Sequence, residues 1–436
     1  MLQRASNIGA QMSKNILLLQ GPPSFFARDL AEHLQNRGLS VLRVNFCIGD
    51  WFYGRKGASL NYRGSLKNWP DALRKIITEH KITDILYFAD RLPYHVAAQR
   101  VAKEFGINAI SYEFGYLRPD WLIVEKGGQS SYSYFPSDLA EIQKRAKGLP
   151  APNTKLLYPF PFARQATNEV FYNLSNYFLW FTYPKYQADK YYNPLIEYLC
   201  YIPRLIKGSL GASTAETLVE TLVEGDDPFF VIPLQMQNDY QIRKNSPYDG
   251  LHEFIEEILI SFKAHGQENA RLVFKVHPLD NGMENWPKVL KKLGAKYNLS
   301  DRIDYLDGGN LFALLKAAKG SVIINSTTGV SALQLGCPVI TLGIAVYDIK
   351  GITYQGNLDA FWKRPGKVNR TNVSALLRLF AHSIHVKGNF FTKEGRHAAA
   401  TAFADRLIEN RINDGGYPMV QDRIAKARKM GIEIDD

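Results

Sequence analysis

The sequence contains little cysteine: three residues in a chain of 436, at Cys47, Cys200 and Cys337. They are far apart and odd in number, which fits neither a disulfide framework nor the closely spaced ligands of a structural zinc site. We therefore expect the chain to work in a reducing compartment.

Long apolar runs are also missing. No stretch of about 18 apolar residues occurs, as a transmembrane helix would require, and the N-terminal MLQRASNIGAQMSKN lacks the apolar segment of a secretory signal. Short-period repeats and low-complexity tracts are absent as well, which argues against a solenoid or an interaction tail. These features predict a cytoplasmic protein.

Acidic residues are outnumbered, with 42 Asp and Glu against 53 Lys and Arg, which gives a formal net charge of +11. Such a charge calls for an anionic partner: a nucleic acid, an acidic membrane surface or an acidic small molecule. The densest basic run, Arg423–Lys429, is short, and no nucleic-acid-binding motif accompanies it. We therefore expect no nucleic acid among the partners.

What the sequence does contain is an alternation of short apolar runs with helical patterns, over a length that suits two domains. The alternation predicts an α/β fold with parallel sheets, arranged as two Rossmann-like domains, a ligand cleft between them and C-terminal helices. The predicted strands are Asn15–Gln20, Ser40–Phe46, Asp84–Phe88, Asn108–Tyr112, Pro228–Pro233, Arg271–Val276, Ile303–Leu306, Ser321–Ile324 and Pro338–Leu342.

The predicted organisation has four parts: a Rossmann-like domain over residues 1–165, a helical bridge over 166–225, a second Rossmann-like domain over 226–370 and helices over 371–436. Within the bridge, Asn168–Lys207 is rich in aromatic residues. It is either an interdomain packing element or a lipid-facing patch, and the two roles are compatible. The second role would also use nearby cations: Lys185, Lys190, Arg204 and Lys207.

A carboxylate follows the fourth predicted strand. Glu113 comes directly after Asn108–Tyr112, and Gly115 beside it lets backbone approach a ligand closely. Because the carboxyl ends of parallel strands face the cleft, we predict Glu113 as the catalytic carboxylate, the alternative being an ordinary surface turn. We expect the nearby Arg118 to keep it ionised.

Two further motifs follow strands of the second half. Lys275 and His277 lie on one face of the strand that ends at Val276, and Pro278 forces a turn. We predict that the pair binds a phosphate or carboxylate and that His277 takes part in catalysis, the alternative being a lone histidine at a strand end. Next, a polar turn opens a helix, and its hydroxyls and backbone N–H groups are typical of an anion site, although ordinary capping is the alternative. It consists of Asn325, Ser326, Thr327 and Thr328.

Other polar residues at predicted strand ends are weaker candidates. Arg91 or Arg118 would hold a sugar carboxylate bidentately, with surface salt bridges as the alternative. Asp90 precedes Arg91. Gln235 follows a strand of the second half and would line the nucleotide side of the donor site, and Gln20 and Gly21 lie at the end of the first strand, where they would face the acceptor.

A strand-terminal Glu-x-Gly, then Lys-x-His-Pro, then a Ser/Thr-rich turn resembles bacterial transferases that use CMP-activated sialic acid or Kdo (3-deoxy-manno-octulosonic acid). Longer segments resemble the KpsS-like β-Kdo transferase branch of the capsule polysaccharide synthesis family over roughly residues 15–400. They include QGPPSFFARDLA, VNFCIGDW, EFGYLRPDW, PLQMQND and NSTTGVSALQLGCPVITLG.

The resemblance implies a GT-B-like, retaining glycosyltransferase that moves Kdo, or a related sugar acid, from CMP-Kdo to an anionic lysophosphatidylglycerol-type lipid. It starts the capsule glycolipid linker at the cytoplasmic face of the inner membrane, with other capsule synthesis and export proteins as further candidate partners. His277, Pro278 and the Ser326 turn would bind the CMP moiety, so residues 226–370 would be the donor domain. No cofactor is implied, and no Asp-x-Asp motif for a metal ion is present.

Two alternatives stay open. Phe114 stands where related enzymes often carry a second carboxylate, which favours a non-catalytic glycolipid-binding or export adaptor of the same fold. A twin-Rossmann enzyme acting on a UDP-sugar, such as an epimerase, is the other alternative.

Overall fold

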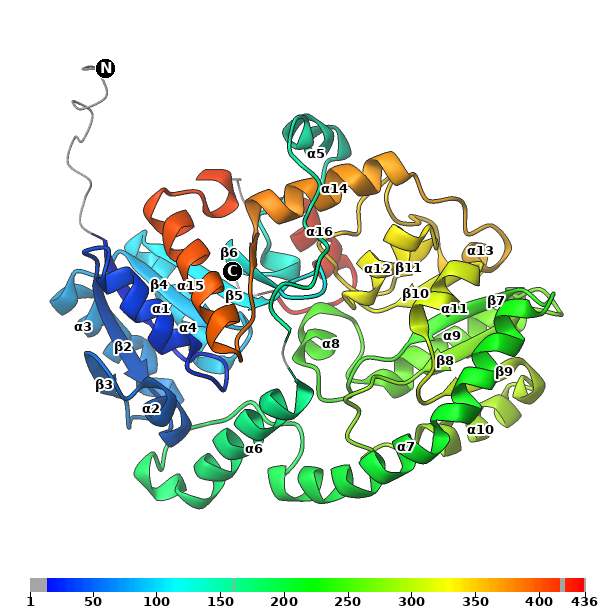
Figure 1. Cartoon of the computed structure of the whole chain (residues 1–436), viewed down its shortest axis with the longest axis horizontal. Helices are drawn as coiled ribbons and strands as arrows, with labels where there is room; N and C mark the ends of the chain where they lie inside the picture. Colours follow the sequence, from blue (N-terminus) through cyan, green and yellow to red (C-terminus); the bar gives the residue numbers. More distant parts are fainter. Residues whose placement is uncertain (1–13, 160, 416–419, 435–436) are drawn as a thin grey trace.

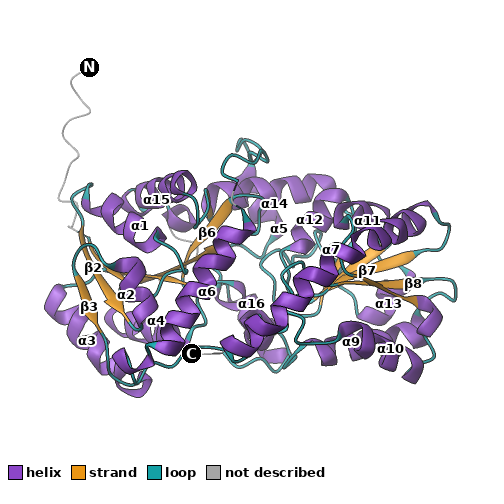
Figure 2. Cartoon of the chain, turned by 60° about the horizontal axis from the view of Figure 1, so that its bottom comes forward, coloured by secondary structure: helices purple, strands orange, loops and turns teal. Residues whose placement is uncertain are grey.

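The computed structural model describes residues 14–159, 161–415 and 420–434, and the side chains of 202–212, 414, 415 and 421 lie outside the description. Two α/β halves lie side by side (Figure 1). Each half is a sheet with helices on both faces (Figure 2). A helical segment, α6 (Phe162–Phe178), η3 (Trp180–Thr182) and α7 (Pro194–Glu224), connects them.

The strands of the first sheet are β1 (Asn15–Leu18), β2 (Ser40–Asn45), β3 (Ser59–Asn61), β4 (Asp84–Phe88), β5 (Asn108–Phe114), β6 (Trp121–Lys126) and β12 (His385–Lys387). Within the described residues their order is β12-β6-β5-β4-β1-β2-β3. Strands β1 to β5 run parallel, whereas β6 is antiparallel to β5 and to β12. The helices of this half are α1 (Phe26–Gln35), α2 (Ile48–Gly54), η1 (Leu66–Asn68), α3 (Trp69–His80), α4 (Pro93–Phe105), η2 (Ser130–Tyr132) and α5 (Leu139–Ala146).

The second sheet contains β7 (Phe229–Pro233), β8 (Arg271–Lys275), β9 (Ile303–Leu306), β10 (Gly320–Ile323) and β11 (Val339–Thr341). Its order is β11-β10-β7-β8-β9, and all pairs are parallel. Its helices are α8 (Tyr240–Asn245), α9 (Leu251–His265), α10 (Trp286–Lys296), η4 (Ser300–Arg302), α11 (Leu311–Ala317), α12 (Thr328–Leu335) and α13 (Leu358–Lys363). The parallel strands of both sheets therefore wind in the same order, and the chain has the predicted GT-B-like architecture.

Local sequence explains the crossovers. In α1, Phe26, Leu30 and Leu34 recur at helical spacing and are all buried. Helix α4 begins at Pro93, whose missing N–H costs nothing in the first turn, and it ends at Gly106, which adopts a left-handed conformation with φ of 64°. These signals determine where the crossover helices begin and end, and the helical crossovers allow successive strands to pair in parallel.

All predicted strands are present, each within two residues of its predicted ends. The expectation of purely parallel pairing is wrong for β6 and β12, which form an antiparallel edge. The sequence from 372 onward is not helical throughout, because β12 follows α14 (Arg370–Ser383) and precedes α15 (Lys393–Ile408), η5 (Ile412–Gly415) and α16 (Gln421–Lys429). A strand of three residues is too short to leave a periodic pattern.

The C-terminal segment returns to the first half. Helix α15 packs beside α1, where Arg396 Nε donates to Asp29 Oδ2 at 2.7 Å. In α16, Arg423 is buried and donates to main-chain carbonyls, including those of Pro136 and Val346, each at 3.1 Å. The basic run Arg423–Lys429 is therefore in part a packing element, since its first arginine is buried.

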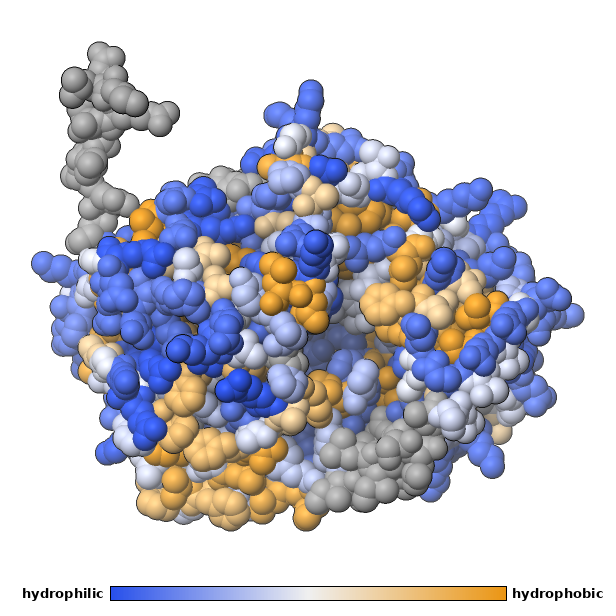
Figure 3. All heavy atoms as spheres, viewed as in Figure 1, coloured by the Kyte–Doolittle hydropathy of each residue, from blue (hydrophilic) through white to orange (hydrophobic). Residues whose placement is uncertain are grey.

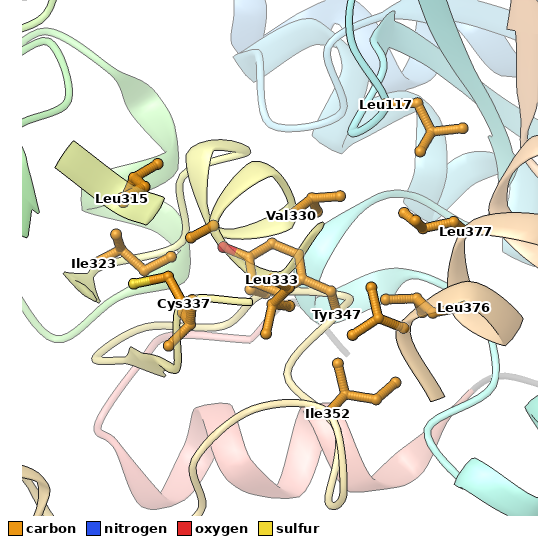
Figure 4. Packing of buried hydrophobic residues seen from close by; sticks show 14 of the residues in the cluster. Leu117, Leu315, Ile323, Val330, Leu333, Cys337, Tyr347, Ile352, Leu376 and Leu377 are labelled. Carbon is orange, nitrogen blue, oxygen red and sulfur yellow. The ribbon is translucent and has the colours of Figure 1, made fainter. Parts of the chain in front are cut away.

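One apolar cluster joins the two halves. Leu117 from the first half belongs to the same buried group as Val330 and Tyr347 from the second, and Leu376 and Leu377 of α14 complete it (Figure 4). A shared core of this kind favours a fixed arrangement of the two sheets. Among the described helices, none is long and apolar enough to span a bilayer.

Candidate active site

The winding order of the second sheet places its switch point between β7 and β10, where a ligand crevice is expected. Gln235 follows β7 and Asn325 follows β10. Their side chains meet there, with Gln235 Nε2 donating to Asn325 Oδ1 at 3.1 Å. Two of the predicted donor-site residues are therefore neighbours, although they are far apart in the sequence.

The same two amides hold helix α8. Gln235 Nε2 also donates to Asp239 Oδ2 at 3.1 Å, and Asp239 caps α8 by accepting the Gln241 N–H at 2.9 Å. Asn325 Nδ2 donates to the Gln241 carbonyl at 3.0 Å. The switch point thus fixes the direction in which α8 leaves the second sheet.

Helix α8 reaches the first half. The Tyr240 hydroxyl donates to Glu113 Oε2 at 2.6 Å and accepts from Gln241 Nε2 at 2.8 Å. One turn later, Asn245 Oδ1 accepts from the Ser131 hydroxyl at 2.7 Å. Glu113 therefore lies where the two halves meet, as predicted for a cleft residue. Tyr240, by contrast, was not predicted, because a tyrosine in a polar helix carries no motif.

Burial dominates the electrostatics of Glu113 and raises its pKa to about 8. The Tyr240 hydrogen bond lowers this pKa, the Asp239 charge raises it, and the Arg118 charge lowers it by less than these. The expectation that Arg118 keeps Glu113 ionised is therefore wrong for the unliganded protein. At neutral pH the side chain is largely a carboxylic acid.

Phe114 points away from this contact. Strand side chains alternate between faces, and the Phe114 ring packs on Phe390, with centroids 5.2 Å apart, and is stacked on Phe391 at 6.1 Å. A carboxylate at position 114 would lie among these rings and beside Arg118, whose guanidinium is 5.9 Å from the Phe114 ring centroid, instead of facing Tyr240. Glu113 is thus the motif residue directed at the other half of the molecule.

Gly115 is required for packing. A Cβ there would lie 2.8 Å from His385 Cδ2 and 2.8 Å from the Trp121 carbonyl oxygen. Beside it, His385 Nε2 accepts the Tyr116 N–H at 2.9 Å, and its Nδ1 donates to the Phe380 carbonyl at 3.0 Å. Burial lowers the pKa of His385 to about 3. This neutral histidine positions the loop that leads to Arg118, and its place late in the chain gave no sequence signal.

Arg118 crosses to the donor motifs. Its Nη2 donates to Thr327 Oγ1 at 3.4 Å. His277 accepts the Leu279 N–H on Nδ1 at 3.1 Å, and burial, followed by the Arg118 and Lys275 charges, lowers its pKa to about 4. His277 is therefore neutral at physiological pH. With Nδ1 as the acceptor, Nε2 carries the proton and serves as a hydrogen-bond donor.

The remaining residues of the donor motifs have structural contacts of their own. Lys275 is buried and its Nζ donates to the Gly308 carbonyl at 2.5 Å, so it holds the loop after β9. Pro278 is exposed in the following turn. Ser326 Oγ accepts the Thr328 N–H at 3.2 Å at the start of α12. The hydroxyl-rich turn is thus both a helix cap and a neighbour of Arg118.

Asp90 and Arg91 form an internal pair. Both are buried, with Arg91 Nε 3.3 Å from Asp90 Oδ2, which also accepts the Gln129 N–H at 2.9 Å. The Arg91 guanidinium lies 3.9 Å from the centroid of the Tyr132 ring. The alternative of a salt bridge describes this pair better than a sugar-binding role, although the bridge is buried and not at the surface.

Gln20 and Gly21 follow the carboxyl end of β1, an interior strand of the first sheet, and Gln20 contacts the helical segment. Gln20 Nε2 donates to the hydroxyls of Tyr172 and, at 3.0 Å, of Tyr186. A Cβ on Gly21 would lie 2.9 Å from Ala27 Cβ, so its glycine is explained by packing on α1. These two residues are separate from the group formed by Glu113, Arg118, His277, Thr327 and Tyr240.

That group combines a neutral carboxylic acid, a neutral histidine, an arginine and hydroxyls. It offers hydrogen-bond donors and a cation to an anionic ligand and a titratable carboxyl to its reacting end. Among the described residues, no group of three or more His, Cys, Asp or Glu side chains is arranged to hold a metal ion.

A family described as capsule polysaccharide biosynthesis protein matches residues 83–391. The capsule polysaccharide export protein KpsS of Escherichia coli is 36% identical, covering 80% of this chain and 90% of its own. The capsule polysaccharide modification protein LipB of Neisseria meningitidis serogroup A is 31% identical, with coverage of 88% and 93%. Among solved structures, KpsC β-Kdo 2,7 transferase of Thermosulfurimonas dismutans aligns with a TM-score of 0.44 at 16% identity, covering 90% of this chain and 98% of its own. This chain belongs to the capsule polysaccharide biosynthesis family.

Proposed function

We propose that the protein is a glycosyltransferase that moves Kdo, or a related sugar acid, from a CMP-activated donor to a lysophosphatidylglycerol-type lipid, at the start of the capsule glycolipid linker. The observation that carries the proposal is the 2.6 Å contact between Tyr240 and Glu113. It places a titratable carboxyl of one sheet against the crevice of the other, in a family that makes capsule polysaccharide.

The second half would bind the donor. CMP leaves as a phosphate monoester, so its departure requires hydrogen-bond donors and positive charge around the phosphate. His277 Nε2–H, the Arg118 guanidinium and the start of α12 at Thr328 provide these. We propose that transfer needs no metal ion, and chelation with EDTA should leave the rate unchanged.

The first half would supply the catalytic carboxyl. To act as base or nucleophile, Glu113 must lose its proton, which burial opposes in the unliganded protein. The Tyr240 hydroxyl donates to it and stabilises the ionised form once it has formed. A β-linked donor and a β-linked product would require retention of configuration.

The enzyme would act at the cytoplasmic face of the inner membrane as a peripheral protein. The net charge of +11 attracts anionic lipids, and the segment that connects the halves exposes aromatic side chains. Of the cations predicted to assist, Lys185 and Lys190 are exposed, whereas the side chains of Arg204 and Lys207 lie outside the described residues. Flotation with anionic vesicles should exceed that with neutral ones and decrease with salt.

The decisive experiment measures CMP release from CMP-Kdo with and without monoacyl phosphatidylglycerol, together with the appearance of the glycolipid. Lipid-dependent release of CMP with formation of a Kdo-lipid supports the transferase. If CMP-Kdo binds and neither product appears under any lipid condition, the transferase proposal is wrong.

A second candidate is a glycolipid-binding or export adaptor of the same fold. Two points favour it: Phe114 stands where the family resemblance implies a second carboxylate, and a relative is called an export protein. The direction of Phe114 into an aromatic cluster weakens the first point. An adaptor would bind the finished glycolipid and release no CMP in the same assay.

A further inference from the structure

A cavity of about 690 Å³ lies between α6 and the segment that follows it. Its lining is largely aromatic and aliphatic and includes Tyr172, Phe178, Trp180 and Ala188. This volume is in the range of about 300–1,000 Å³ that small-molecule sites usually occupy. The reacting group around Glu113 does not line it, so the cavity is a separate feature.

The rim of the cavity is apolar and faces solvent. Phe178 and Trp180, which line the cavity, are 60% and 63% exposed, and the adjacent Phe181 is 61% exposed. Figure 3 shows hydrophobic residues gathered over α6 at the lower edge of the molecule. Burying such rings in a bilayer interface is favourable because tryptophan and phenylalanine insert at headgroup level. Lys185 and Lys190 are exposed in the same segment and complement anionic lipid.

The opposite end of the cavity is polar. Tyr172 lines the cavity, and its hydroxyl donates to Asp50 Oδ1 at 2.8 Å and lies 3.0 Å from Cys47 Sγ. Gln20 donates to the same hydroxyl. These groups stand after β1 and β2, at the carboxyl edge of the sheet that also carries Glu113. Tyr172 thus connects the aromatic cavity to Gln20 and Asp50, which follow β1 and β2 of the sheet that carries the candidate carboxyl.

The wall of the cavity also contacts the helix that carries Tyr240. Asp189 and Tyr191 flank Lys190, which lines the cavity. Asp189 Oδ1 lies 3.6 Å from Arg243 Nη2 on α8, and the Arg243 guanidinium lies 5.1 Å from the centroid of the Tyr191 ring. The cavity and the candidate catalytic residues therefore share one structural support.

We infer that this cavity binds the acyl chain of a single-chain anionic phospholipid. The chain lies along the aromatic walls toward the bilayer, and the headgroup phosphate lies beside Lys190, a cation that lines the cavity. The inference rests on the proposed function in that it names the subsite for the lipid acceptor. Lipid binding accounts for three features of the segment after the first half: the polar contacts of Tyr172, the exposed lysines and the exposed aromatic rings.

The experiment uses the full chain and monoacyl phosphatidylglycerols with 8, 10 and 12 carbons, kept below their micellar concentrations. Binding is measured by calorimetry. Because each buried methylene contributes about 0.8 kcal/mol, affinity should increase about fourfold per added methylene while the chain fits. Glycerophosphoglycerol, which has no acyl chain, should bind at least about 100-fold more weakly than the 12-carbon lipid.

Two variants test whether the lipid binds in this cavity. Ala188→Trp narrows the cavity and should weaken the 12-carbon lipid about tenfold or more, and Phe178→Ala should weaken it about three- to tenfold. Phe312→Ala is the matched control, because Phe312 is also a well-exposed phenylalanine, at 57%, but lies on α11. It should bind as wild type does. Thermal melting confirms that each variant is folded.

Affinity that does not change with chain length, or wild-type affinity in both Ala188→Trp and Phe178→Ala, overturns the inference. A CMP titration and a transfer assay on the same samples separate the two proposals. If CMP binds and the lipid is glycosylated without chain-length dependence, the cavity assignment fails and the transferase stands. If chain-length dependence is present and no transfer occurs, the cavity assignment stands and the transferase fails.

Discussion

The two sheets wind their parallel strands in one order, yet they present opposite chemistry at their carboxyl ends. The first half carries carboxyl groups whose pKa values are raised by burial: Asp50 to about 6 and Glu113 to about 8. The second half presents a neutral histidine, His277, and the hydroxyls of Ser326 and Thr327. The common scaffold thus presents Asp50 and Glu113 on one side and mainly hydrogen-bond donors on the other. Arg118 of the first half completes the anion site, and burial also raises the pKa of Asp239 in the second half.

The difference indicates how a transferase divides its work between two similar domains. An anionic leaving group is stabilised where donors converge, and a buried carboxyl is useful where a proton must move. Both requirements conflict if they are placed on one sheet edge, since a carboxylate repels a phosphate. In this protein the Glu113 carboxyl and the proposed phosphate site belong to separate sheets, bridged by Tyr240 of α8, which reduces that repulsion.

The largest expected effect separates two glutamates of the first half. Glu113 and Glu125 both have a pKa raised to about 8 by burial, but Glu113 contacts the second half and Glu125 lies inside the first. Glu113→Gln should lower transfer by about 10³-fold or more while CMP-sugar binding persists. Glu125→Gln, the matched control, should transfer within about twofold of wild type. Initial rates of glycolipid formation provide the measurement.

If Glu113→Gln retains transfer within about tenfold of wild type, the carboxyl is structural. The comparison between the halves would then lose its catalytic meaning, and Asp239 beside α8 would be the next carboxyl to test.

The donor side should show the next largest effect. His277→Ala should reduce kcat by about 10²-fold, because the leaving phosphate loses the Nε2–H donor. His252, which is exposed and lies 3.0 Å from Glu284 at the surface of the same half, provides the control in His252→Ala. Turnover of CMP-Kdo at saturating donor distinguishes them. Equal rates for both variants would remove His277 from the site.

Sequence patterns predicted the elements well because each parallel strand is a short apolar run closed by a turn. They also directed attention to Glu113, His277 and Thr327 as candidates, since strand ends of a doubly wound sheet are ligand positions, and the structure links each of these to Arg118 by a hydrogen bond or by charge. Tyr240 and His385 were missed because their roles depend on contacts between residues more than a hundred positions apart.

Burial was the second thing the sequence did not reveal. Asp90 and Arg91 follow a strand as Glu113 does, but they are enclosed as a pair. The same applies to the ionisation of Glu113, which Arg118 was expected to maintain. The number of atoms packed around a side chain decides whether it is enclosed and how far its pKa shifts, and a single sequence contains no measure of that number.

The pH dependence should show which way the Glu113 proton moves. If Glu113 acts in its ionised form, kcat/KM for transfer should increase about tenfold per pH unit below about pH 8 and level off above it, because the free enzyme must lose that proton. His277, with a pKa lowered to about 4, stays neutral over this range. A rate that decreases through pH 8 would make Glu113 a general acid.

The smallest effect concerns stability, and Glu125 provides it. Its carboxyl is buried, accepts a hydrogen bond from Ser133 and has a pKa raised from 4.5 to about 8. Between those values the native state binds more protons than the unfolded state, so the free energy of unfolding falls as pH rises.

Glu125→Gln mimics the protonated form and removes this loss. The variant should therefore gain about 1–3 kcal/mol relative to wild type between pH 5 and pH 8, measured by urea unfolding at both pH values. Glu256→Gln is the control, because Glu256 is only partly buried and its pKa is lowered by its hydrogen bond with Lys296, so its difference from wild type should be flat over the same range. A flat difference for Glu125→Gln as well would mean that the Glu125 carboxyl is ionised in the folded protein. The first half would then differ from the second in its core as well as at the carboxyl ends of its strands.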